Sequence, residues 1–181
     1  FGCTAYSDHV NDAHLNPAVV GKPVTWIAQQ AGFVVPEDTQ IICAECQEVG
    51  TNEPLTREKL SPVLAVLKAT STEDGIEKSA AMVEFNGLGH SAAIHTQDHD
   101  ITVQFGLKCK AIRVIENAPS TFGGIGSVYN AFIPSLTLGC GSYGHNSVSN
   151  NVSAINLLNI KRIGRRNNNM QWVKLPPKVY F

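Results

Sequence analysis

The sequence has no strong excess of charge of either sign and no long apolar run. Its 14 Lys and Arg stand against 15 Asp and Glu, for a formal net charge of −1 over 181 residues. These totals do not favour nucleic acid or an anionic membrane surface as a partner. No apolar stretch approaches the ~20 residues needed to cross a bilayer. The hydrophobic content of 43% instead suits a globular chain with a sizeable core.

The cysteines are too few and too irregularly spaced for a disulfide framework, and their odd number favours reduced thiols in the cytoplasm. Cys43 and Cys46 lack the second pair that a zinc site needs. Residues three apart on a strand face opposite sides, so we expect two buried structural cysteines. The same alternation argues against a metal shared by His90, His95 and His99. We therefore expect no metal site. The five cysteines are Cys3, Cys43, Cys46, Cys109 and Cys140.

The N-terminus lacks both an initiator methionine and the charged-then-apolar order of a signal peptide. The sequence starts at Phe1 and stops at Phe181 after an extended segment. We therefore expect the chain to be a piece of a longer protein.

Strand and helix patterns alternate along the first two thirds of the chain. Ser71 or Thr72 can cap a helix that ends at Gly87. The nearly continuous apolar run 61–69 is typical of a strand buried on both faces. Residues 99–109 are ambiguous, with a helix the better fit. The alternation predicts an α/β fold with a mostly parallel sheet and crossover helices. The other expected elements are a helix within 22–32 and strands at 39–46, 91–96 and 111–117.

Residues 118–151 are rich in Gly, Ser, Asn and Pro, and an irregular region this long is usually functional. Gly123, Gly124 and Gly126 form a weak phosphate-loop pattern. The dinucleotide fingerprint fails here because Pro119 interrupts the step from strand to helix and no acid follows Glu116. A close approach of this backbone to a ligand remains open.

Three sets of polar residues have two interpretations each. Cys140 lies between two glycines near His145, so it is either a nucleophile served by amides and a base or a small residue in a tight bend. His90 follows two glycines and is either a polar group in a cleft or a structural histidine. The basic cluster is better explained by a solvated face or a subunit contact than by nucleic acid. It comprises Lys161, Arg162, Arg165 and Arg166.

Five stretches, in this order, resemble the C-terminal part of the CoA-acylating aldehyde dehydrogenase domain of bifunctional aldehyde–alcohol dehydrogenases. The resemblance extends over nearly everything from about residue 17 to 181, while residues 1–16 match only loosely. The run 134–147 and the tail after residue 168 are its most specific parts. The stretches are VGKPVTWIAQQAGF, EPLTREKLSPVLAV, NGLGHSAAIHT, SLTLGCGSYGHNS and NNMQWVKLPPKVYF.

The resemblance implies the aldehyde dehydrogenase catalytic-domain fold over 1–153, followed by an oligomerisation strand and exit tail over 154–181. It implies reversible reduction of acetyl-CoA to acetaldehyde by NADH, with NAD as cofactor and coenzyme A as substrate. The family's nucleophilic cysteine and coenzyme-binding domain lie upstream of this chain, so we expect the chain alone to be inactive. Implied partners are the missing N-terminal part of the domain and further copies through 154–169.

The resemblance also assigns site residues. Glu58 matches a glutamate that contacts the nicotinamide ribose in the wider superfamily, and His90 matches a histidine that assists the CoA thiol or positions it. Cys140 becomes a residue that lines the pocket. His145 stands where the family often has glycine, and its role stays open. Leu60 and Pro62 would shape the strand beside Glu58; Phe122, Gly123 and Gly124 would face the CoA arm; Gly139, Cys140 and Gly141 would line the acyl pocket.

Two alternatives to an enzyme segment remain. One is a piece that only assembles with other chains through 154–169. The other is a free-standing thiol enzyme that uses Cys140 and His145.

Overall fold

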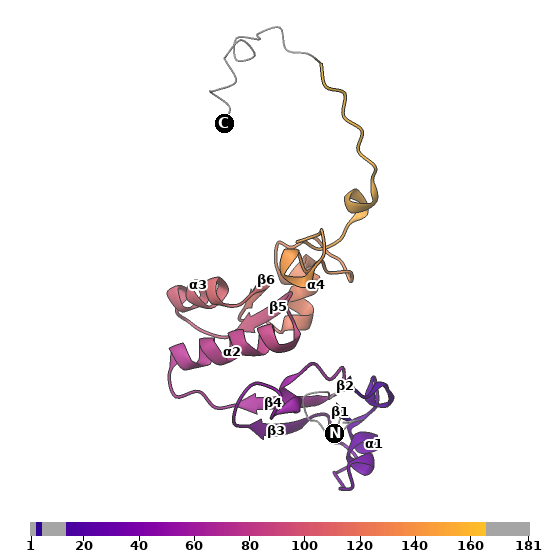
Figure 1. Ribbon diagram of the computed structural model, residues 1–181, viewed down its shortest axis with the longest axis vertical. Helices are drawn as coiled ribbons and strands as arrows, with labels where there is room; N and C mark the ends of the chain where they lie inside the picture. The colour runs from indigo at the N-terminus through magenta and orange to yellow at the C-terminus, as the bar shows by residue number, and fades with distance from the viewer. Residues whose placement is uncertain (1–2, 5–13, 166–181) are drawn as a thin grey trace, which may run out of the picture.

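The computed structural model describes residues 3–4 and 14–165 (Figure 1). It is an α/β fold with parallel strand pairing, which confirms the predicted class. Among the described residues the strands form separate pairs rather than one sheet. The pair β3–β4 is parallel, as is β5–β6, and β1–β2 is a short antiparallel pair. The strands are β1 (Cys3–Thr4), β2 (His14–Leu15), β3 (Ile42–Cys46), β4 (Val63–Leu67), β5 (Gly89–Ile94) and β6 (Ala111–Glu116).

The first region, residues 14–67, contains α1 (Val24–Gln30) and the β3–β4 pair. Pro23 occupies the position just before α1 and makes no side-chain capping bond, and Gly32, with φ of +84°, follows the last turn. Glycine adopts this left-handed conformation without a Cβ penalty. The buried core of the region is Val19, Ile27 and Val63, with Leu15, Trp26, Ile42 and Leu55 packed against it.

Strand β4 is buried on one face only, so the prediction from its apolar run is wrong. Val63 is 2% exposed, whereas Leu64 and Val66 are 49% and 42% exposed. The crossover between β3 and β4 contains only the 3-10 helix Pro54–Thr56. A connection of this kind has no α-helical face to lay over the second side of the strands, as a usual parallel crossover does.

The second region, residues 71–116, packs α2 (Thr72–Asn86) and α3 (His99–Lys108) against β5–β6. The Ser71 hydroxyl accepts a hydrogen bond from the Asp74 amide, 3.2 Å away, and caps α2 as predicted. Asp98 caps α3 in the same way, which confirms a helix in the ambiguous segment. Figure 1 shows α2 between the two parallel strand pairs. The buried core is Ile76, Ala80, Phe105 and Cys109.

The glycine-rich region contains a helix that the sequence did not suggest, α4 (Ser120–Ile125), which contacts β5 and β6. A Cβ on Gly123 would lie 2.3 Å from Ile115 Cγ2. Only glycine therefore permits this close packing of α4 on β6.

The strand that the resemblance implies from residue 154 onward is not seen over 154–165, and it stays a prediction. Ala154–Leu157 is a 3-10 helix, and residues 158–165 run on without regular structure. A strand needs a partner for its backbone groups, and the part of the chain that the structure describes pairs no strand with these residues. The remainder of the predicted strand, with Arg166, lies outside the described residues. None of the helices within 14–165 is long and apolar enough for a membrane span.

Candidate active site

A cavity of about 330 Å³ lies where the β3–β4 crossover meets the end of α2 and the start of β5. Glu58 from the crossover and His90 from β5 both line it. The sequence had assigned these two residues to the same reaction, 32 positions apart, and the structure brings them to one cavity. The lining residues are Thr56, Arg57, Glu58, Lys59, Met82, Val83, Asn86, Gly87, His90 and Ser91.

The Glu58 segment is fastened to α2 by two contacts. The Glu58 amide donates to Asn86 Oδ1 at 3.0 Å. The guanidinium of Arg57 lies 4.6 Å from the ring centre of Phe85, a cation–π contact. The Glu58 residue itself remains exposed, so its carboxylate is available to accept hydrogen bonds.

His90 is held by its backbone and leaves its imidazole exposed. The His90 amide donates to the Gly87 carbonyl at 3.3 Å. Its Nδ1 lies 3.1 Å from Ser91 Oγ, and which of them donates depends on the tautomer. The end of α2 therefore holds Glu58 through Asn86, and the glycine that follows the helix, Gly87, holds His90.

Lys59 points inward beside Glu58 and is 8% exposed. Its Nζ donates to the carbonyls of Leu55 at 2.6 Å and Arg57 at 2.8 Å. These bonds fold the crossover around the ammonium group. Sequence reasoning missed Arg57, Lys59 and Asn86 as site-forming residues, because their bonds are either local to a loop or join distant segments.

Leu60 and Pro62 do not line the cavity. Leu60 has φ of +46° and is 53% exposed, and its carbonyl accepts from the Gly21 amide at 3.2 Å. The Pro62 carbonyl accepts from the Ile42 amide at 3.0 Å. Both residues thus form backbone hydrogen bonds at the start of β4, and the role predicted for them beside the cofactor stays a prediction.

At Gly89 the backbone just before His90 meets the glycine-rich turn around Cys140. Gly89 has φ of +82°, and a Cβ there would lie 2.1 Å from the Cys140 carbonyl oxygen. No side chain fits at that distance. The turn around Cys140 therefore packs directly on the backbone next to His90.

The amides around Cys140 are occupied within the chain. The N–H groups of Cys140 and Gly141 both donate to Asn146 Oδ1 at 3.1 Å. Cys140 Sγ lies 4.0 Å from the Leu138 carbonyl. Within 14–165 no hydrogen bond joins this thiol to the ring of His145, whose own φ is +58°. The arrangement fits a tight bend and does not favour a free-standing thiol enzyme.

The other predicted pocket residues separate into buried and exposed groups. Gly139 and Gly141 are buried beside Cys140, and Gly123 and Gly124 are buried in α4. Phe122 is 48% exposed and stacks on Tyr129, with ring centres 5.2 Å apart. A Cβ on Gly124 would lie 3.7 Å from Ser91 Oγ, so α4 comes close to the residue after His90.

Cys43 and Cys46 face opposite ways, as the strand period predicted. Cys46 is buried, and this burial, with a smaller contribution from Glu53, raises the pKa of its thiol. Cys43 is exposed, so the prediction that both are buried is wrong for that residue. In the described ranges, no three His, Cys, Asp or Glu side chains are grouped closely enough to hold a metal ion.

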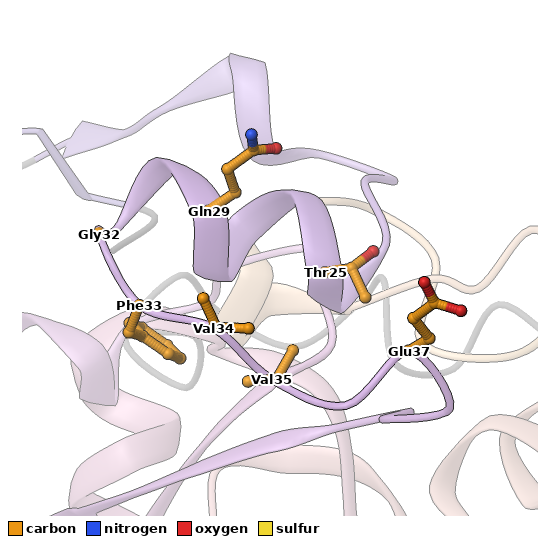
Figure 2. A pocket seen from close by; sticks show the side chains of 7 residues that line it. All are labelled: Thr25, Gln29, Gly32, Phe33, Val34, Val35 and Glu37. Carbon is orange, nitrogen blue, oxygen red and sulfur yellow. The ribbon is translucent and has the colours of Figure 1, made fainter.

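A second cavity, of about 370 Å³, lies between α1 and the segment that follows it. Figure 2 shows Thr25 and Gln29 on the helix and Phe33, Val34 and Val35 on the facing segment. Glu37 is its one ionisable side chain, and it contains no predicted site residue. The surface that lines this second cavity is mainly apolar.

Comparison with known proteins shows that the chain is similar to a segment of aldehyde–alcohol dehydrogenases. It is 72% identical over all 181 residues to the aldehyde–alcohol dehydrogenase of Streptococcus pneumoniae, of which it covers 20%. It is 45% identical over 171 residues to the bifunctional aldehyde–alcohol dehydrogenase of Escherichia coli, covering 92% of this chain and 19% of that protein. The chain thus spans about one fifth of the length of these curated relatives. No family model matches it.

Solved structures show the same fold. A probable aldehyde dehydrogenase from Listeria monocytogenes superposes with a TM-score of 0.82 at 39% identity, over 90% of this chain and 36% of that one. An acetylating aldehyde dehydrogenase from Geobacillus thermoglucosidasius gives 0.78 at 41% identity, over 85% and 34%. The chain therefore has the fold of a segment of an acylating aldehyde dehydrogenase.

More particularly, the chain is related to the acylating aldehyde dehydrogenase region of aldehyde–alcohol dehydrogenases, over its whole length in one case and over 92% of it in the other. This confirms the resemblance seen in the sequence. The chain is a partial segment relative to every one of these proteins.

Proposed function

We propose that this chain supplies cofactor-binding and thiol-step residues to a CoA-acylating aldehyde dehydrogenase. The reaction converts acetyl-CoA, NADH and a proton reversibly to acetaldehyde, NAD⁺ and free CoA. The observation that carries the proposal is the shared cavity of Glu58 and His90. The relatedness to proteins named acetylating aldehyde dehydrogenase and aldehyde–alcohol dehydrogenase supports it.

Glu58 would hold the ribose next to the nicotinamide. Its exposed carboxylate has two oxygens that can accept from two neighbouring hydroxyls, and the bond from its amide to Asn86 fixes where the residue sits. A cavity of about 330 Å³ is at the lower end of the range for small-molecule sites, roughly 300–1,000 Å³, and suits part of a dinucleotide. Bound NADH would supply the hydride.

His90 would act on the thiol of coenzyme A. An exposed imidazole can accept the proton from a thiol as it attacks, and return it when the thiol leaves. The bond between the His90 amide and Gly87, with the contact of Nδ1 to Ser91, limits where the ring can go. Gly139, Cys140 and Gly141 would form the acyl pocket wall, and Phe122, Gly123 and Gly124 the side nearest the CoA arm.

The rest of the site would come from the preceding part of the same cytoplasmic protein, which carries the nucleophilic cysteine. We assign residues 1–153 to the catalytic domain and 154–181 to an oligomerisation strand and exit tail. The chain alone would be inactive.

The competing candidate is a piece that only assembles. The observation in its favour is the exposed apolar arm that follows Ser153, in which Leu157 is 84% exposed and Ile163 is 94% exposed. An arm of this kind can pair with a second copy through residues 154–169.

A chimera separates the two candidates. In it, residues 1–181 replace the matching fifth of the Streptococcus pneumoniae aldehyde–alcohol dehydrogenase. We expect oxidation of NADH driven by acetyl-CoA at a rate within about tenfold of the parent, since 72% of the segment is identical. A chimera that folds and assembles like the parent, yet shows no such oxidation, would contradict the enzymatic proposal and favour assembly alone.

A further inference from the structure

Arg113 is a buried cation with no carboxylate partner among the described residues. It lies in β6 and is 3% exposed. Four ion pairs are formed within 14–165, and none includes it. Burial lowers the pKa of its guanidinium, and the nearby Cys140 thiol opposes this shift. The guanidinium nonetheless stays charged at neutral pH. Burying this charge costs free energy, which hydrogen bonds to the guanidinium must offset.

Three neutral acceptors surround the guanidinium. Its Nε donates to Asn151 Oδ1 at 2.9 Å, and one terminal nitrogen donates to the His90 carbonyl at 2.7 Å. The other terminal nitrogen donates to the carbonyl of Gly139, the residue before Cys140. One side chain thus binds β5 at His90, the Cys140 turn and residue 151.

Asn151 extends this network and is itself 4% exposed. Its Nδ2 donates to the carbonyls of Gly124 at 2.9 Å and Ile133 at 2.7 Å. Gly124 belongs to the end of α4. The pair Arg113–Asn151 therefore connects every segment that carries a predicted acyl- or CoA-pocket residue.

We propose that Arg113 and Asn151 are positioning residues, which together set the place of His90 relative to the Cys140 turn and α4. The inference rests on the proposed function only for the role of His90. An apolar pair of the same volume could stabilise a core as well as a buried charge does, often better. What the forked guanidinium adds is directional contact with two backbone carbonyls, those of His90 and Gly139, and with the Asn151 side chain. A flexible ammonium cannot reproduce that geometry.

Arg113→Lys tests the proposal, because lysine keeps the charge and loses the fork. The matched control is Phe105→Leu, a buried change in the same region that touches none of the network. In this chain, labelling by iodoacetamide is followed on the peptide that contains Cys140. We expect labelling to be about fivefold or more faster in Arg113→Lys than in the unaltered chain, as the turn loses its anchor. Phe105→Leu should leave it unchanged.

In the chimera, we expect Arg113→Lys to slow the CoA-dependent step by about 10- to 100-fold, since small misplacements of catalytic groups have effects of this size. The KM for NADH should stay within about twofold, because Glu58 lies outside the network. Asn151→Ala should shift the same quantities in the same direction. If Arg113→Lys alters neither labelling nor the CoA step beyond the Phe105→Leu control, the pair is only structural and the proposal fails.

The two levels of the test keep the proposals separate. Suppose that Arg113→Lys speeds the labelling of Cys140 in this chain but the chimera never reduces acetyl-CoA. That result would overturn the proposed function and leave the positioning of the turn intact. If the chimera is active and Arg113→Lys changes neither labelling nor the CoA step, the positioning proposal fails and the proposed function stands.

Discussion

The two parallel strand pairs differ most in how their strands are connected. The β5–β6 crossover contains α3, and that helix packs with α2 over a buried core. The β3–β4 crossover has a single 3-10 turn, and one face of β4 is exposed. The two candidate site residues lie on these two different regions. Glu58 lies on the β3–β4 crossover, which has no covering α-helix, and His90 lies on β5, which packs with α2 and α3.

Polar contacts follow the same division. In the second region Lys108 pairs with Glu77 at 2.7 Å and Lys110 with Glu84 at 2.8 Å. These exposed pairs add little stability individually, but both fasten α2 to the segment that leads into β6. The first region is joined to α2 chiefly at the Glu58 segment, through Asn86 and Phe85.

The largest expected effect on stability is the loss of the core of the second region. Phe105 is 5% exposed, and Phe105→Ala should reduce the free energy of unfolding by about 3–5 kcal/mol. Urea denaturation followed by circular dichroism measures this. A loss of under about 1 kcal/mol would mean that this core does not hold the region together.

Gly89→Ala should come next, and Gly32→Ala is its control from the first region. Both glycines have positive φ, but a Cβ meets the Cys140 carbonyl only at Gly89, and nothing lies within 4 Å at Gly32. We expect Gly32→Ala to cost about 1 kcal/mol from backbone strain alone and Gly89→Ala more than about 2 kcal/mol. If the two variants lose the same free energy of unfolding, the Cys140 turn does not pack closely against Gly89.

A neighbouring pair on β4 tests its one-sided burial. Val63→Ala should cost about 1–3 kcal/mol, because Val63 is 2% exposed. Leu64→Ala should cost under about 1 kcal/mol, because Leu64 is 49% exposed. Urea denaturation of the two variants measures both losses. If Leu64→Ala lowers the free energy of unfolding as much as Val63→Ala does, the exposed face of β4 is covered after all.

The smallest effect concerns the start of α2. A hydrogen bond from Lys78 Nζ, 2.8 Å away, lowers the pKa of Asp74, and the Thr70 amide adds to this. The ionised carboxylate therefore stabilises the fold above its ordinary pKa of 3.8, and this contribution is lost as the pH falls through the lowered value. Asp74→Asn should lower the Tm slightly at pH 7 and progressively less below pH 3.8. A Tm difference that is independent of pH would count against this carboxylate.

Local sequence signals predicted where the helices lie better than they predicted which strand faces are buried or which residues form the candidate site. Ser71 and Gly87 defined α2 because capping depends on neighbouring residues. Burial of β4 depends on what lies over it, which the apolar run cannot specify. The helix α4 was missed because two glycines are poor helix formers, and their use became clear only when Ile115 was seen against Gly123.

The candidate site came from resemblance more than from spacing. Residue chemistry alone left His90 and Cys140 with two interpretations each. Asn86 reaches Glu58 across 28 positions and Arg113 reaches Asn151 across 38, and no local pattern reveals such pairs. A charged residue within the apolar strand 111–116 was the one available signal for Arg113.

The central claim is that the two regions divide the reaction, with the cofactor held by Glu58 and the thiol step served by His90. Rapid-mixing kinetics of the chimera test it most directly. We expect Glu58→Gln to slow hydride transfer or weaken NADH binding, with acyl transfer to CoA unchanged. His90→Ala should slow acyl transfer to CoA with NADH binding unchanged. Two variants that impair the same step to the same extent would contradict the division, as would two variants with the rates of the unaltered chimera.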